Sequence, residues 1–199
     1  MAKKAEGVVE ITNENILCET KFLELKEVDY IDNGEQKKWS YVSRKKTNGI
    51  VAIIAKKGYR FLFIVQKRIP VNKNVISFPS GLIDLVDDKK HPGKKRPETP
   101  REAAARELTE ETGYIINKVI SISPLLPKSA GLTNESVYIV QCTVKDKHGD
   151  PTDPTEGIIP FWMSPKKLME HVKELDKNEN AVESMAWTFI SGYIHDKKI

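Results

Sequence analysis

Three glutamates gather in the last turn of one expected helix. When residues 99–113 are placed on a helical wheel, Glu107, Glu110 and Glu111 fall on one face and span about 100°. Like charges three and four residues apart repel, and the C-terminal end of a helix favours cations. Such a turn indicates either a solvated acidic face or a site for a divalent cation. Carboxylate oxygens at this density suit Mg2+ or Mn2+.

The spacing of these residues decides between the two interpretations. Glu98 is followed after seven residues by Arg106-Glu107, then by Glu110-Glu111 and Gly113. This order resembles the second half of the Nudix box, G-x5-E-x7-R-E-U-x-E-E-x-G-U with U apolar. All eight defined positions from Glu98 onward are met. The resemblance favours the metal site over the solvated face.

The start of the box departs from the pattern. Strict spacing would place glycine at position 92, which is Pro92. The segment Phe78-Pro79-Ser80-Gly81-Leu82-Ile83-Asp84 resembles instead the loop that opens the box in ADP-ribose pyrophosphatases. Gly81 then precedes Glu98 by 17 residues rather than 6, an insertion of 11 that largely coincides with a basic run at 88–96. We expect this run to be a solvated loop that affects substrate choice and leaves the helix in place.

The resemblance implies a set of metal ligands and catalytic residues. The expected metal ligands are oxygen donors of the box and of the loop before it: Ser80, Glu98, Glu107, Glu110 and Glu111. Glu107, Glu111 and the Ser80 carbonyl would be the principal Mg2+ ligands, and the other two would bind a further ion. Arg106 would orient the glutamates by ion pairing. The general base stays open between Glu156 and a helix glutamate.

Segments outside the box, over roughly 36–195, resemble the ADP-ribose and ADP-sugar branch of the family. The substrate-binding residues that this implies are Trp39, Arg44, Arg68, Gly81, Gly131 and Leu132. Trp39 would stack on adenine, and Arg44 and Arg68 would contact phosphates or the terminal ribose. Without the resemblance, Trp39 would more often be a core or interface residue, and the arginines would be surface charges.

The elements that must position these residues follow from local signals. Thr99-Pro100-Arg101-Glu102 predicts a capping box with proline at the first helical position, and Gly113 predicts a left-handed stop. The other expected elements are extended segments at 15–30, 38–43, 49–55, 60–66, 117–123, 136–145 and 157–162, a hairpin turn at Asn33-Gly34, and helices at about 165–174 and 178–195. We therefore expect an α+β fold, a Nudix-type α/β/α sandwich with a mixed sheet, preceded by a small N-terminal antiparallel sheet.

Length, composition and net charge exclude several classes of protein. The chain has 199 residues, a net charge of 32 − 28 = +4, and 39% hydrophobic residues, which excludes wholesale disorder. The charge is too small to indicate nucleic-acid binding by itself, and no apolar run is long enough for a membrane span or a signal peptide. Cys18 and Cys142 match no zinc spacing, so we expect two buried, reduced thiols in a cytoplasmic protein.

The resemblance implies metal-dependent hydrolysis of the pyrophosphate bond of ADP-ribose or a related nucleoside diphosphate sugar, giving AMP and a sugar phosphate. It also implies a homodimer that exchanges the N-terminal strands, so we divide the chain into residues 1–45 and a Nudix domain at 46–199. Other nucleotide sugars, FAD or NADH, and capped RNA remain alternative substrates, since the basic insertion could neutralise phosphates. A ligand-sensing Nudix domain without activity is a further alternative, although such domains typically lose box glutamates.

Overall fold

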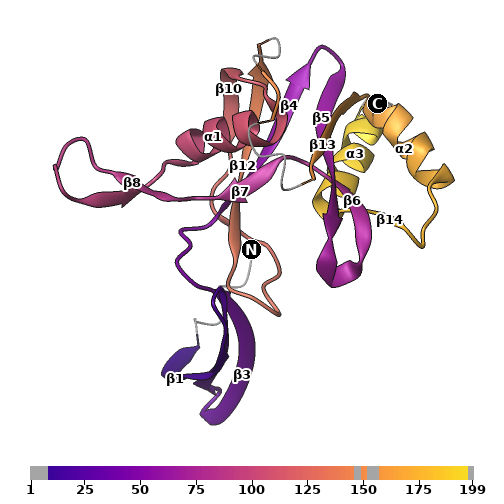
Figure 1. Cartoon of the computed structure of the whole chain (residues 1–199). Helices are drawn as coiled ribbons and strands as arrows, with labels where there is room; N and C mark the ends of the chain where they lie inside the picture. The colour runs from indigo at the N-terminus through magenta and orange to yellow at the C-terminus, as the bar shows by residue number, and fades with distance from the viewer. Residues whose placement is uncertain (1–8, 146–148, 152–156, 197–199) are drawn as a thin grey trace, which may run out of the picture. The chain divides into compact units, whose positions relative to one another are not determined.

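The computed structural model describes residues 9–145, 149–151 and 157–196 (Figure 1). The chain divides into two compact units. The first contains residues 1–47 and 126–137, and the second contains residues 48–125 and 138–199. The expected catalytic residue Glu156 lies outside the described residues.

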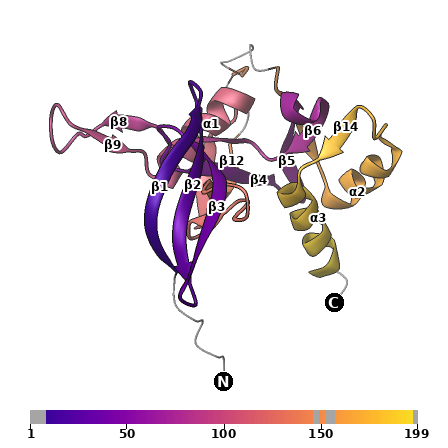
Figure 2. The ribbon, with the colours of Figure 1, turned by 90° about the horizontal axis from the view of Figure 1, so that it is seen from below.

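The first unit is built on a three-stranded antiparallel sheet. Its strands are β1 (Glu10–Glu19), β2 (Leu23–Asp32) and β3 (Glu35–Arg44), in the order β1-β2-β3 (Figure 2). Asn33 and Gly34 both have positive φ, 54° and 81°, as a two-residue hairpin turn requires. The extended segment expected over 15–30 is two strands. The chain reverses at residues 20–22, where the Thr20 hydroxyl accepts a hydrogen bond from the Leu23 amide at 3.0 Å.

A mixed sheet forms the centre of the second unit. The strand order is β10-β12-β4-β5-β6-β14, where β10 is Ile116–Ile122, β12 is Ser136–Val144, β4 is Ile50–Lys57, β5 is Arg60–Arg68, β6 is Lys73–Ser77 and β14 is Asn180–Val182. The short strands β7 (Ser80–Leu82) and β13 (Ile159–Met163) pair with β4 and β5. The first two residues of β12 pair with β11 (Leu126–Pro127), and these residues are counted in the first unit. β14 runs parallel to β6, whereas β5 and β6 are antiparallel, so the sheet is mixed.

Helices cover both faces of this sheet. Alternate residues of β4 point to opposite faces, as strand geometry dictates. Val51 and Ile53 pack with Leu108 of α1 (Pro100–Thr112). Ile54 packs on the other face with Ile190 of α3 (Ser184–Asp196), and that face also receives α2 (Pro165–Glu174). The expected α/β/α sandwich with a preceding antiparallel sheet is confirmed.

Helix α1 begins and ends as its sequence predicts. The Thr99 hydroxyl accepts a hydrogen bond from the Glu102 amide at 3.2 Å, and the Glu102 carboxylate accepts one from the Thr99 amide at 2.8 Å. Gly113 is left-handed, with φ of 72°, and its amide donates to the Thr109 carbonyl. These caps fix where the acidic turn of α1 stands.

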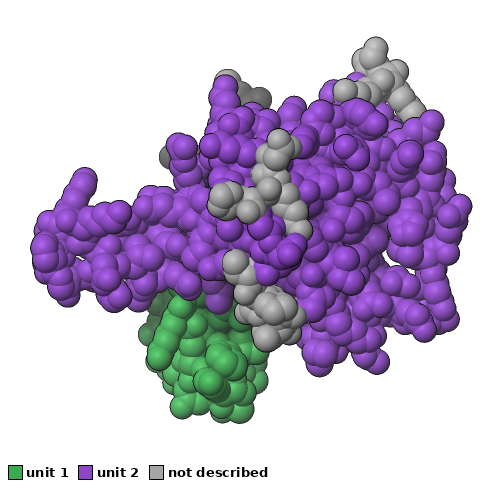
Figure 3. Space-filling view, turned by 45° about the horizontal axis from the view of Figure 1, so that its top comes forward, with its two compact units in different colours: residues 1–47, 126–137 green, residues 48–125, 138–199 purple. Residues whose placement is uncertain are grey.

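The basic insertion is a hairpin rather than an unstructured loop. β8 (Leu85–Asp87) and β9 (Lys95–Pro97) pair antiparallel, and the hairpin projects from the rest of the second unit (Figures 1 and 3). Lys95 pairs with Asp87 at 2.8 Å, and His91 contacts Asp88 at 2.7 Å. The run is mostly solvent-exposed as expected, but cross-strand pairing gives its base a regular structure.

Two other expectations are corrected. The helix expected at 178–195 begins at Ser184, because residues 180–182 gain a hydrogen-bonding partner in β6 and form β14. Cys18 is exposed, since every residue of the edge strand β1 is exposed. Cys142 is buried as expected, and burial raises the pKa of its thiol to about 12. Among the described residues, no helix is long and apolar enough to cross a membrane.

Candidate active site

Arg106 holds the acidic turn of α1 together. Its Nε and Nη2 donate to the two oxygens of Glu98 at 3.0 and 2.8 Å. Its Nη1 donates to Glu107 at 2.8 Å and to Glu110 at 3.0 Å. Nη2 also donates to the Leu82 carbonyl at 2.9 Å. A planar guanidinium with five donors can serve several acceptors at once, so one side chain joins the helix to the preceding loop.

The loop at 78–84 fits closely against the same turn. The Ser80 amide donates to Glu111 Oε2 at 3.0 Å, and the Asp84 amide donates to Glu98 Oε2 at 3.1 Å. Gly81 stands against Glu107, where a Cβ would lie 1.8 Å from the carboxylate carbon. Only glycine leaves this space free, so the loop and α1 approach each other through Gly81.

The Ser80 backbone is directed toward α1 by the strand register. Ser80 faces Ala52 in the antiparallel pair of β7 and β4, and the ladder hydrogen bond beside it joins the Ile53 amide to the Pro79 carbonyl at 2.8 Å. In such a pair, the N–H and C=O of one residue point to the same side. Because the Ser80 amide points to Glu111, we expect its carbonyl to face the same side as the acidic turn.

The pKa values of the carboxyl groups in the acidic cluster are shifted in opposite directions. Glu98 is almost fully buried, and the Arg106 guanidinium holds the pKa of its carboxyl below the usual value. Burial instead raises the pKa of Glu107, an effect that the ion pair with Arg106 opposes. Asp84 and Glu110 also pair with Arg106, so four carboxylates share one guanidinium. The cluster thus keeps an excess of three negative charges (4 − 1) before Glu111 is counted.

The side chains as they stand are turned toward Arg106 rather than toward a common centre. Within residues 9–145, 149–151 and 157–196, no three histidine, cysteine, aspartate or glutamate side chains are grouped as a metal centre would require. The donors are nevertheless hard oxygen ligands with surplus negative charge, which is the chemistry that Mg2+ and Mn2+ prefer.

The structure brings together one part of the predicted site. The residues that meet in the second unit are Ser80, Gly81, Glu98, Arg106, Glu107, Glu110 and Glu111. Arg68, at the end of β5, is exposed and forms no ion pair with any described residue. The remaining predicted residues belong to the first unit: Trp39, Arg44, Gly131 and Leu132.

Within the first unit, the segment after β11 lies beside β3. The Val42 amide donates to the Leu132 carbonyl at 2.8 Å, and Arg44 Nε donates to Glu135 Oε1 at 2.9 Å. Trp39 is 49% exposed, which is unlike a core residue. These contacts place the segment that contains Leu132 and Glu135 beside β3, which carries Arg44.

Sequence reasoning missed three partners in these groups. Asp84 and the Leu82 carbonyl complete the surroundings of Arg106, and Glu135 anchors Arg44. Asp84 and Glu135 stood inside the loops that carried the resemblance. Their acidic side chains within those loops were the available signal, but neither residue lies near its arginine in the sequence.

Comparisons with known proteins identify the family of the chain. A family model described as NUDIX domain matches residues 45–188. Putative nudix hydrolase 2 of Caenorhabditis elegans is 30% identical over 211 aligned positions, which cover 96% of this chain and 88% of that protein. An uncharacterized Nudix hydrolase of Schizosaccharomyces pombe is 28% identical over 93% of this chain and 91% of its own.

Two further relatives have names that mention ADP. The ADP-sugar pyrophosphatase of Mus musculus is 26% identical over 67% of this chain and 61% of that protein. A crystal structure of an ADP compounds hydrolase superposes with a TM-score of 0.70 over 98% of both chains, at 20% identity, a likeness that concerns the fold alone. With a family model over most of its length and a relative 30% identical across 96% of it, the chain belongs to the Nudix family of hydrolases, which are pyrophosphatases acting on phosphoanhydrides.

Proposed function

We propose that this hydrolase cleaves the pyrophosphate bond of ADP-ribose or a related nucleoside diphosphate sugar and releases AMP, or another nucleoside monophosphate, and a sugar phosphate. The observation that carries the proposal is the complete set of box glutamates, held by Arg106 on one turn of α1 against Ser80 and Gly81. The name of the mouse relative supports the substrate class.

The cluster suits a divalent cation by charge and by donor type. Glu107 and Glu111, with the Ser80 carbonyl, would be the principal ligands of Mg2+ or Mn2+, while Glu98 and Glu110 would bind a further ion. Such a cation neutralises phosphoryl oxygens and lowers the pKa of a bound water. The surplus of three negative charges in the cluster is the feature that favours cation binding.

The chain's own residues would orient the reacting groups. Arg106 offsets the mutual repulsion of the carboxylates and fixes them relative to the Leu82 carbonyl, so its role is positioning. The general base is either Glu156 or a helix glutamate. Burial raises the pKa of Glu107, a direction that makes a carboxylate a stronger base.

The substrate-binding residues are assigned by the family resemblance. The exposed indole of Trp39 would stack on adenine. Arg44 and Arg68 would contact phosphates or the terminal ribose, with Glu135 restricting the guanidinium of Arg44. Gly81, Gly131 and Leu132 lie in the loops that we assign to the substrate.

A homodimer formed through residues 1–45 would cover apolar side chains that the three-stranded sheet exposes. The exposed apolar side chains of the three-stranded sheet are Ile11, Ile16, Leu17, Leu23, Leu25, Ile31 and Trp39. Isolated exposed apolar residues are ordinary, but so many on one small sheet favour an interface. An exchange of these strands between two copies, with residues 46–199 as the Nudix domain, would place the sheet in the neighbouring site.

The test is product identification with Mg2+ and a panel of ADP-ribose, other nucleotide sugars, FAD, NADH and capped RNA. We expect AMP and ribose 5-phosphate from ADP-ribose, and loss of turnover in Glu111→Gln with the melting temperature nearly unchanged. Glu174→Gln, on the exposed end of α2, is the matched control and should retain full activity. Cleavage of capped RNA alone would replace the proposed substrate. Binding of every ligand without cleavage would indicate a sensor.

A further inference from the structure

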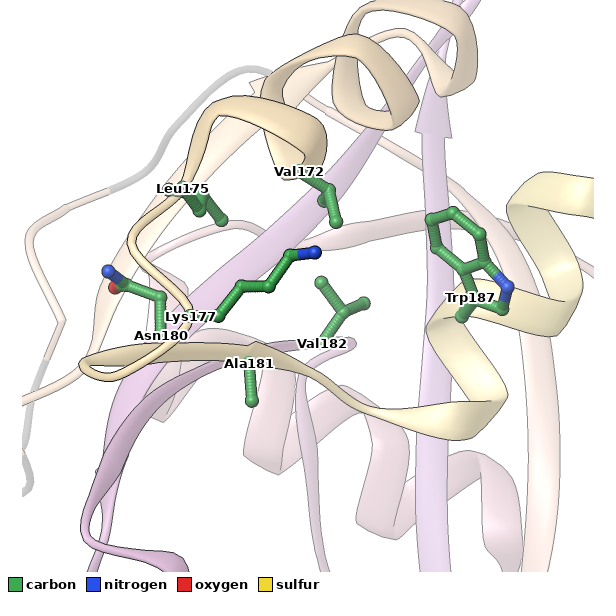
Figure 4. Close-up of a pocket in the computed structure, with 7 residues that line it drawn as sticks. All are labelled: Val172, Leu175, Lys177, Asn180, Ala181, Val182 and Trp187. Atoms are coloured by element: carbon green, nitrogen blue, oxygen red, sulfur yellow. The ribbon is translucent and has the colours of Figure 1, made fainter.

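A cavity of about 280 Å³ lies between the end of α2, strand β14 and the first turn of α3 (Figure 4). Its lining is mainly apolar and consists of Val172, Leu175, Ala181, Val182 and Trp187, with Lys177 and Asn180. Helices α2 and α3 pack on one face of the sheet and α1 packs on the other. The cavity is therefore separated by the sheet from the box glutamates, and it has no part in the proposed hydrolysis.

The backbone that carries Lys177 is held in place. Within the turn, the Asn180 amide donates to the Asp176 carbonyl at 2.9 Å, and the Asn178 amide donates to Asp176 Oδ1 at 2.8 Å. Lys73 Nζ, from β6, donates to the Lys177 carbonyl at 2.6 Å. The Lys177 side chain extends from this fixed turn across the cavity between Val172 and Val182 (Figure 4).

The charge of Lys177 is not matched within the cavity. Its ammonium forms no ion pair with any side chain in the part of the chain that the structure describes, and the other lining residues are neutral. A cation above apolar walls is complementary to an anion that carries an apolar body. The indole of Trp187, 40% exposed, offers a flat surface at the far side of the cavity from Leu175 (Figure 4).

The size of the cavity restricts the ligand further. Sites for drug-sized ligands usually measure about 300–1,000 Å³, so this cavity suits a molecule of one or two rings and is too small for a nucleoside diphosphate sugar. An aromatic ring beside an indole gains offset or edge-on contacts that an aliphatic chain does not.

We propose that this cavity binds a small aromatic carboxylate, with its ring among Val172, Val182 and Trp187 and its carboxylate on the Lys177 ammonium. The ligand class follows from the apolar walls, the single unmatched cation and the volume. The proposal adds a binding site to the hydrolase and does not depend on which substrate the box glutamates act upon.

The test uses phenylacetate as the probe, with the full chain, by saturation-transfer NMR and calorimetric titration. Phenylacetamide is the neutral counterpart, and acetate is the counterpart without a ring. We expect saturable binding of phenylacetate, at least about fivefold weaker binding of phenylacetamide, and no measurable binding of acetate. Lys177→Gln should weaken phenylacetate binding by the same factor, whereas the control Lys118→Gln, on exposed β10, should not change it.

Two variants and one null result keep the proposal open to refutation. Trp187→Leu keeps an apolar side chain but removes the indole, and should weaken binding while the melting temperature reports the fold. Equal binding of phenylacetate by the wild type and Lys177→Gln would overturn the assignment of the carboxylate. Equal binding by Trp187→Leu would overturn the assignment of the ring, and no saturation up to about 10 mM would overturn the site.

Discussion

Replacing Gly81 by alanine tests the close approach between the loop at 78–84 and α1. A Cβ on Gly81 would lie 1.8 Å from the Glu107 carboxylate carbon and 2.0 and 2.2 Å from its oxygens. Ordinary contacts begin at 3.4 Å, so the carboxylate must move by about 1.6 Å, the difference between the two distances. Because it ends a flexible side chain, we expect the fold to survive with about 1–2 kcal/mol less free energy of unfolding.

The effect on activity should be much larger. The displacement removes Glu107 from its 2.8 Å contact with Arg106 and from the position that we propose for a metal ligand. A misplacement of about 1 Å in a catalytic arrangement costs on the order of a hundredfold in rate. We therefore expect kcat for pyrophosphate hydrolysis to fall about a hundredfold, and the apparent Mg2+ affinity to fall at least about tenfold.

The assay combines initial rates of AMP release over a series of Mg2+ concentrations with urea unfolding. Gly192→Ala is the matched control, because a Cβ on Gly192 in α3 meets nothing within 4 Å. Alanine favours a helix over glycine by up to about 1 kcal/mol, so this variant should be slightly more stable and fully active. A Gly81→Ala protein with wild-type kcat and Mg2+ dependence would refute the reasoning.

Two further predictions concern the insertion and the start of α1. The pKa of Glu102 is lowered from 4.5 to about 2, mainly by the hydrogen bonds from Arg96 and to a smaller extent by those from the amide and hydroxyl of the N-cap Thr99. The resulting stabilisation should be complete above pH 4.5 and lost as the pH falls toward 2. Carboxyl NMR should show this low pKa, and Arg96→Gln should raise it. An unchanged pKa of Glu102 in the variant would contradict the assigned cause. Replacing Lys89, Lys90 and Lys94 by alanine removes three positive charges from a protein whose net charge is +4. This change should raise KM for an anionic nucleotide about two- to threefold at low salt. That difference should vanish near 1 M salt, where the Debye length is about 3 Å, and its persistence would exclude an electrostatic cause.

Local signals in the sequence predicted α1 and its acidic turn, since a capping box, a stop glycine and a charge pattern all act within a few residues. Partners distant in sequence were not readable in the same way. Glu135 and Arg44 are 91 residues apart, and β14 forms only because β6 lies alongside it. Cys18 was misjudged because an apolar residue type does not reveal that its strand forms the exposed edge of a small sheet.

The base of the basic hairpin has a consequence for how the family pattern is preserved. Asp84 and Glu98 are 14 residues apart, yet the Asp84 amide donates to the Glu98 carboxylate and the Glu98 amide donates to the Asp84 carbonyl at 2.8 Å. The inserted chain leaves and returns at one closed point, so its length is decoupled from the geometry of the site. The box is interrupted in sequence but continuous in space. At the tip near Gly93, the chain length can therefore change in evolution, or a tag can be inserted, without moving the glutamates.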